Sequence, residues 1–125
     1  MKNSKIAATF INLNEIMNKE EKYPVKFSYA LSKNLIAIEP LNKAYTEARD
    51  HLLDRYNRKD DDGKPAYKIT GKIEIAEEYQ AVWQKEFQEL LDIEVEFTPH
   101  MISVEDLPEG IEPAILYALD FMIKE

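Results

Sequence analysis

Cysteine is absent from this 125-residue chain, and glycine is scarce, with three residues. Without cysteine there is no disulfide, thiolate nucleophile or thiolate metal site, so a reducing compartment is expected. Few glycines and 45% hydrophobic residues favour a folded, helix-rich domain. No apolar stretch approaches the roughly 18 residues that span a bilayer, and Asn12, Asn14 and Glu15 interrupt any signal-like run near the start. We therefore expect one cytoplasmic domain over residues 1–125 that binds no membrane.

Cations are nearly missing from the second part of the chain. Residues 74–125 contain fourteen carboxylates against Lys85 and Lys124, a net charge of −12, whereas residues 1–73 carry a net charge of +4. The whole chain therefore has a charge of −8 that is strongly polarised along the sequence. Such a distribution favours a protein that is steered electrostatically toward a partner.

The sequence also lacks the motifs that carry common enzyme chemistry. It has no glycine-rich phosphate loop. The acidic turn 60–63 fails as a calcium-binding EF-hand, because the first ligand position would be Arg58 and the last would be Ile69. Neither His51 nor His100 has both a nucleophile and an orienting acid at useful spacing. We therefore assign no catalytic residue, cofactor or metal ligand, and expect a protein that is not an enzyme.

Helical periodicity covers most of the chain. Apolar residues recur at steps of three or four, and this spacing predicts helices over 4–20, 25–57, 76–91 and 113–123. Pro40 interrupts the second pattern, so we expect a kink or break at Ile38 to Pro40.

Two shorter segments, 66–75 and 93–97, alternate apolar and polar residues and are predicted to form a small antiparallel sheet. The first two helices should form an antiparallel helical hairpin, because the Tyr23-Pro24 link between them is short. The predicted fold class is α+β, mainly α. The expected core consists of Phe10, Leu13, Leu31, Leu35, Ile38, Tyr45, Leu52, Trp83, Phe87, Leu90, Val95, Leu116, Leu119 and Met122.

The last predicted helix, 113–123, is apolar nearly all round, with Asp120 almost its only polar side chain. A helix of this kind is either central to the core or partly covered by a partner. Ile11 and Ile36 also lie off the main stripes of their helices. Burial in the core is the preferred interpretation of this helix. Self-association as a homodimer, which would cover this surface, is a further prediction.

Clusters of carboxylates are the main candidate functional groups of the chain. Acidic side chains at high density can steer the protein toward a basic groove, or imitate the phosphates of a nucleic acid. The overall field repels nucleic acid itself, so no direct nucleic-acid binding is expected. The candidate partner-binding residues are Glu86, Glu89, Glu94 and Glu96. The enzymatic alternative is a carboxylate-metal hydrolase that uses Glu74, Glu77 and Glu78 with Glu94 or Glu96.

Several stretches together resemble a family of small proteins of unknown function encoded by phages and prophages of Gram-positive bacteria. They are YPVKFSYALSKNLIAIEPLNKAYTEARDHLLDRY from Tyr23, an Asp-Gly-Lys loop, a Tyr-Lys-Ile segment, KEFQELLDIEVEF and PAILYALDFMI. The resemblance runs in order from about residue 6 to residue 124 and rests on pattern rather than on a catalytic signature. It implies a phage-encoded protein in the cytoplasm of the infected cell, and it implies no activity and no binding residues.

These observations lead to a functional hypothesis. We expect a non-enzymatic phage protein that binds and inhibits or redirects a host protein of defence or nucleic-acid processing through an acidic surface. The first alternative is a phage assembly or replication accessory protein that is recognised through an apolar surface. The carboxylate-metal hydrolase is the second alternative.

Overall fold

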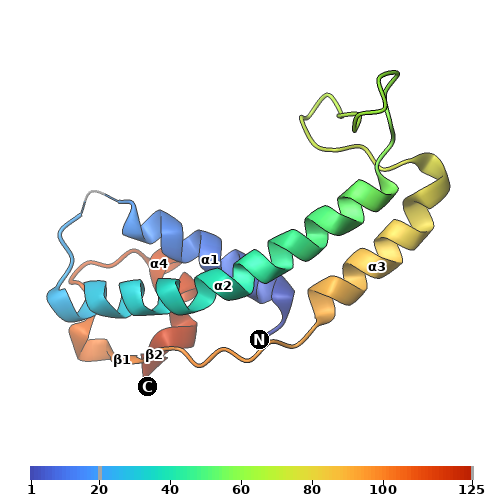
Figure 1. Ribbon diagram of the computed structural model, residues 1–125. Helices are drawn as coiled ribbons and strands as arrows, with labels where there is room; N and C mark the ends of the chain where they lie inside the picture. The colour runs from blue at the N-terminus through green and yellow to red at the C-terminus, as the bar shows by residue number, and fades with distance from the viewer. Residues whose placement is uncertain (20, 125) are drawn as a thin grey trace.

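A 32-residue helix, α2 (Val25–Tyr56), is the spine of the molecule (Figure 1). The computed structural model describes residues 1–19 and 21–124. Helix α1 (Asn3–Met17) lies against the first half of α2 and runs in the opposite direction. Helix α3 (Gln80–Asp92), preceded by a 3-10 turn at Glu77–Tyr79, lies against the second half of α2. The predicted helical hairpin is therefore present in α1 and α2, although α1 ends at Met17 and not at residue 20, which lies outside the described residues.

Proline 40 does not break α2. A kink or a break was predicted at Ile38 to Pro40. The helix is continuous from Val25 to Tyr56, so there is no break, and Figure 1 shows that its axis bends near the middle. Pro40 cannot donate a hydrogen bond to the carbonyl of Ile36. Both residues are exposed, Ile36 at 70%, so water can bind that carbonyl while the buried side of the helix continues.

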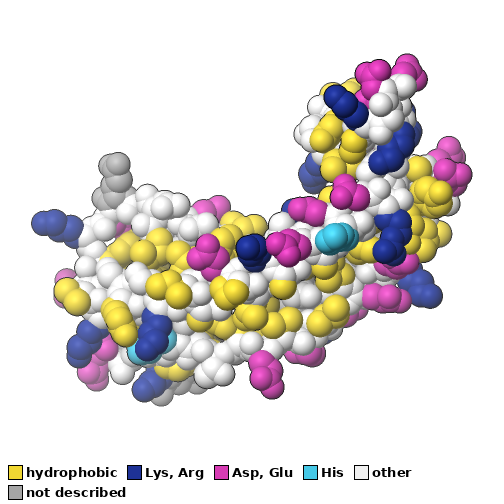
Figure 2. Space-filling model, viewed as in Figure 1, with side chains coloured by type: hydrophobic (Ala, Val, Ile, Leu, Met, Phe, Trp, Pro, Cys, Tyr) yellow, Lys and Arg dark blue, Asp and Glu magenta, His cyan; other side chains and the backbone are white. Residues whose placement is uncertain are grey.

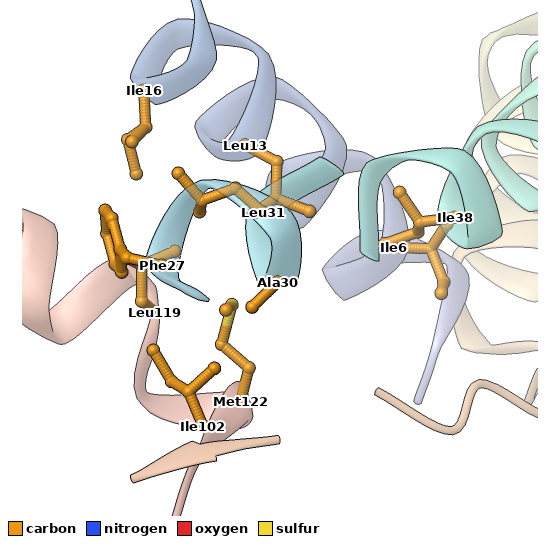
Figure 3. Packing of buried hydrophobic residues seen from close by; sticks show 10 residues of the cluster. All are labelled: Ile6, Leu13, Ile16, Phe27, Ala30, Leu31, Ile38, Ile102, Leu119 and Met122. Carbon is orange, nitrogen blue, oxygen red and sulfur yellow. The ribbon is translucent and has the colours of Figure 1, made fainter. Parts of the chain in front are cut away.

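The hydrophobic core lies at one end of the molecule, which we call the head. It is formed by α1, residues 25–40 of α2 and the C-terminal segment 99–124 (Figure 3). Leu13, Leu31, Ile38, Leu119 and Met122 were predicted and are fully buried there. The expected core list omitted five members of this cluster, although Ile6 and Phe27 lie on the predicted helical stripes. The five are Ile6, Ile16, Phe27, Ala30 and Ile102.

The C-terminal segment differs most from the sequence-based prediction. The predicted helix 113–123 is divided into α4 (Pro113–Ala118), a 3-10 turn at Asp120–Met122, and strand β2 (Ile123–Lys124). The chain leaves α-helical geometry at Leu119, which allows both Leu119 and Met122 to be fully buried in the head. Leu116, which was expected in the core, is exposed.

The predicted antiparallel sheet is wrong. Strand β2 pairs in parallel with β1 (Ile102–Ser103), which is followed by a 3-10 turn at Val104–Asp106. The segment 93–97 is extended and makes one isolated antiparallel bridge, between Glu94 and Lys2. Its alternating pattern identified a half-buried extended chain, but such a pattern does not reveal which segment lies beside it.

Two buried asparagines attach the extended segment and α3 to the head. Asn34 lies on α2; its Nδ2 donates to the carbonyl of His100 at 3.0 Å, and the N–H of His100 donates back to Oδ1 at 2.7 Å. Asn3, at the start of α1, donates from Nδ2 to the carbonyl of Leu90 at 3.0 Å. That carbonyl belongs to the last turn of α3, where it also accepts the N–H of the capping residue Ile93 at 3.4 Å.

Residues 41–56 of α2 and helix α3 form a two-helix arm that extends from the head (Figure 1). Two helices that pack only on each other leave most of their side chains exposed to water. Leu90 is accordingly the only residue of α3 that is buried. Leu52, Trp83 and Phe87 were predicted in the core, but they are only half-buried. Within residues 1–19 and 21–124, no helix combines the length and apolarity needed to cross a membrane.

Residues 57–76 at the end of the arm form a double hairpin. In the first turn, the N–H of Asp60 donates to the carbonyl of Lys64 and the N–H of Gly63 donates to that of Asp60. The second turn repeats this arrangement eight residues later, from Lys68 to Lys72 with Gly71. Gly63 and Gly71 have φ angles of +78° and +86°, which glycine adopts without a steric penalty.

The double hairpin closes on itself at its base. Arg58 donates its N–H to the carbonyl of Glu74, Glu74 donates to Ala66, and Ala66 donates to Arg58, at 2.7, 2.9 and 2.7 Å. These three residues are eight positions apart and form a ring of backbone hydrogen bonds. The predicted strands over 66–75 are therefore replaced by isolated bridges, such as that between Tyr67 and Ile73.

Candidate functional site

The arm carries an open groove of about 790 Å³ between α2 and α3. Figure 2 shows hydrophobic side chains at the surface along the arm, with acidic and basic side chains beside them. The floor of the groove is apolar and is formed by Ala48, Leu52, Leu90 and Ile93. Its polar edge is formed by His51, Arg55, Glu86 and Glu89. The groove exists because α3 covers only one side of the second half of α2.

Glu86 is held in place by α2. The hydroxyl of Tyr56 donates to Oε1 of Glu86 at 2.8 Å, and the guanidinium of Arg55 lies 3.6 Å from Oε2. This carboxylate therefore joins the two helices of the arm as well as lining the groove. Glu89 is exposed one turn further along α3 and makes no ion pair within residues 1–19 and 21–124, so its charge is free to meet a ligand.

The four predicted partner-binding residues do not form one surface. Glu86 and Glu89 lie together in the groove. Glu94 follows the groove on the extended segment, where the α-amino group of Met1 lies 3.2 Å from its carboxylate. Glu96 is exposed two residues later on the same segment. The groove thus brings together two of the four residues, and Glu94 is already engaged by the start of the chain.

The polarised charge of the sequence is partly neutralised within the fold. In the described part of the chain, six ion pairs join a positive group from residues 1–73 to a carboxylate from residues 74–125. They are Met1–Glu94, Lys2–Asp92, Lys19–Glu112, Lys26–Asp106, Arg55–Glu86 and Arg58–Glu74, at 3.2, 3.6, 4.0, 4.0, 3.6 and 2.6 Å. Exposed pairs of this kind contribute at most about 1 kcal/mol each. Some of the carboxylates that were expected to bind a partner therefore form ion pairs within the chain instead.

The carboxylates of the alternative metal site are not gathered around one point. Glu74 is bound to Arg58, with 2.6 Å between Nε and Oε2. Glu77 and Glu78 are exposed on the turn before α3. Among residues 1–19 and 21–124, no three acidic or histidine side chains form a group that could hold a metal ion.

The histidines have separate environments. His51 is exposed at the edge of the groove. His100 is half-buried in the head, and its ring meets the ring of Tyr29 edge-on with 5.5 Å between centroids. Sequence reasoning assigned neither residue a role, and it missed the groove floor because Leu52 and Leu90 follow the same helical stripe as core residues.

Comparisons with known proteins find no matching family model, curated protein or solved structure. The resemblance to phage-encoded proteins therefore stays a prediction.

Proposed function

We propose that this protein is a non-enzymatic binding protein and that the groove of the arm is its binding surface. The observation that supports this most directly is an apolar floor that the chain itself leaves open, with carboxylates along its edge. An apolar centre with a polar rim is the usual composition of a protein-binding site.

The chemistry of the groove defines the kind of partner. A groove between two helices fits an amphipathic helix or an extended peptide whose apolar side chains enter the floor. The free carboxylate of Glu89 favours a partner segment with lysine or arginine beside its apolar anchors. The net charge of −8 argues against nucleic acid as the ligand, because phosphates would be repelled.

The biological setting of this proposal comes from the phage resemblance. In that setting the partner is a host protein of defence or nucleic-acid processing, and binding in the host cytoplasm inhibits or redirects it. Basic grooves of nucleic-acid enzymes would attract the carboxylates that remain free on this protein.

The test is a capture experiment in a lysate of Gram-positive bacterial cells, the hosts that the resemblance implies. Ile93→Asp places a charge on the exposed end of the groove floor, and Glu89→Lys reverses the free carboxylate. Both should reduce recovery of the captured protein, and Glu89→Lys should slow association more than it speeds dissociation. Glu105→Lys is the control, because Glu105 is exposed on the head. Equal recovery with all three variants would refute the groove as the binding surface.

A second candidate function has its own observation. Val25 and Ile36 on the outer side of α2 are 85% and 70% exposed, and Tyr29 lies between them in sequence and is also exposed. This apolar stripe supports the alternative of a phage assembly or replication accessory protein. Recovery that is unchanged at about 1 M salt, where the screening length is only about 3 Å, and that is lost in Ile36→Asp would favour this alternative.

A further inference from the structure

The two turns of the double hairpin have the same backbone but opposite side-chain chemistry. At the first apex the chain places Asp61 and Asp62, and at the equivalent positions of the second apex it places Ile69 and Thr70. Polar residues are the usual choice at an exposed turn. Ile69 is fully exposed, with a relative accessibility of 108%, so its side chain contributes nothing to packing within the described structure.

The surroundings of Ile69 resemble a contact surface. Tyr67 is 63% exposed on the same hairpin. Lys68 and Lys72 flank the apex and make no ion pair in the described part of the chain. We call residues 67–72 the finger. Ile69 lies between the two lysines, with the exposed ring of Tyr67 next to Lys68. This combination matches a socket that is apolar inside and has a carboxylate at its edge.

The arm groove has an apolar floor, and Glu89 is the carboxylate on its edge that makes no ion pair in the described part of the chain, since Glu86 is paired with an arginine of α2. We infer that the finger of one molecule docks in the arm groove of a second copy, with Ile69 on the apolar floor and Lys68 or Lys72 beside Glu89. This inference rests on the proposed function, because it uses the same groove. In Figure 1 the finger lies at the far end of the arm and turns toward the side of α2 that is opposite α3, so it does not occupy its own groove.

Reciprocal docking, with each finger in the groove of the other copy, would use the same two surfaces on both molecules and would give a closed two-fold dimer. A membrane or a nucleic acid is less suited to the finger, because Asp60, Asp61 and Asp62 lie in the adjacent turn and the chain as a whole is acidic.

Sedimentation equilibrium of the full chain over a range of concentrations tests the inference. The wild type should dimerise, and Ile69→Ser should weaken the dimer roughly hundredfold, since burial of an isoleucine side chain is lost at both fingers. Asp61→Ser at the equivalent apex is the matched control and should leave the dimer unchanged. Circular dichroism checks that both variants fold. A wild type that stays monomeric, or an Ile69→Ser variant that dimerises like Asp61→Ser, would overturn the inference.

A charge-exchange experiment tests the orientation of docking. Glu89→Lys alone and Lys68→Glu with Lys72→Glu should each weaken self-association, because like charges would meet in the groove. Mixing the two variants should restore dimers, since the reversed finger then meets the reversed groove. Dimers that do not return on mixing would contradict the proposed contact. Partner capture is a separate measurement: a monomeric wild type that still captures a partner through Ile93 would leave the proposed function standing.

Discussion

Asn34 takes the place of a neighbouring strand for the extended segment before β1. Its side-chain amide both donates to and accepts from the backbone of His100, as a peptide group of a strand would. The same Nδ2 also lies 3.3 Å from the sulfur of Met122. With a relative accessibility of 1%, Asn34 joins the spine, the extended segment and the C-terminal segment. Sequence patterns could not identify this role, because a polar residue within a helical stripe is equally compatible with exposure.

Replacing Asn34 should therefore be costly. Asn34→Asp keeps the shape but removes the donor to the carbonyl of His100, and we expect it to lower the free energy of unfolding by about 2 kcal/mol or more, because a buried acceptor loses its partner. Urea denaturation measures the change. Asn12→Asp is the control, since Asn12 is half-buried on α1 and its side chain makes no hydrogen bond in the described part of the chain. Equal losses in the two variants would contradict the role of Asn34.

Tyr23 makes the stability of the folded protein depend on pH at alkaline pH. Its hydroxyl oxygen is buried and makes no hydrogen bond with the described residues. Burial raises the pKa of Tyr23 above its usual 10.0, and the nearby carboxylates of Glu21 and Glu112 add to the increase. The folded state therefore holds the Tyr23 proton more tightly than the unfolded state does. The contribution of this proton to the free energy of unfolding is complete below pH 10 and is lost as the pH rises above 10.

Tyr23→Phe should remove this dependence. The variant keeps the edge-on contact with Phe27, whose ring centroid lies 5.0 Å away, and loses only the buried hydroxyl. At pH 7 its free energy of unfolding should equal or exceed that of the wild type, since a buried hydroxyl without a partner is unfavourable. Above pH 10 the variant should lose less stability than the wild type. Denaturation curves between pH 7 and 11 measure both effects, and parallel losses would refute the assignment.

At the scale of elements, helices were the most predictable part of the fold. The stripes in α1, α2 and α3 repeat over several turns, so their periodicity identified each helix to within a few residues. The C-terminal segment was not predictable in this way, because a run that is apolar on all sides has no stripe. There the chain changes geometry at Leu119, and this change depends on packing against the head.

Pro40 provides a test of how α2 tolerates its bend. Pro40→Ala restores a donor toward the carbonyl of Ile36 and should raise the free energy of unfolding by about 1–3 kcal/mol. Ala44→Pro, at another exposed position of α2, should lower it by a similar or larger amount. Thermal denaturation measures both. A less stable Pro40→Ala variant would mean that both halves of the molecule require the bend for their packing.

At the scale of the whole molecule, the sequence predicted most of the helices but not their division into head and arm. Two Gly-Lys pairs, at Gly63 and Gly71, are eight residues apart, but no repeat was predicted from them, and the ring of hydrogen bonds depends on three segments meeting. The ion pairs between the two halves of the chain were equally hidden, because composition gives the charges and not their neighbours. Of the four predicted site residues, only Glu86 and Glu89 share the groove.

The uneven core predicts uneven stability. The main cluster of buried residues lies in the head, whereas α3 buries only Leu90. Amide hydrogen exchange should therefore be faster in α3 than in α1, because local opening of the arm exposes less apolar surface. Mass spectrometry of exchange-labelled peptides measures this difference. Uniform protection of α1 and α3 at low protein concentration would show that the arm does not open independently.

The bend in α2 also has a mechanical consequence. Residues 41–56 extend about 24 Å beyond the bend at about 1.5 Å per residue, and the double hairpin is attached to their far end. A change of about 10° in the bend would displace this end by roughly 4 Å, calculated from the same helical rise. The spine therefore acts as a lever. A contact in the head that slightly straightens α2 would move the double hairpin, at the opposite end of the molecule, by a much larger distance than it moves the residues at the bend.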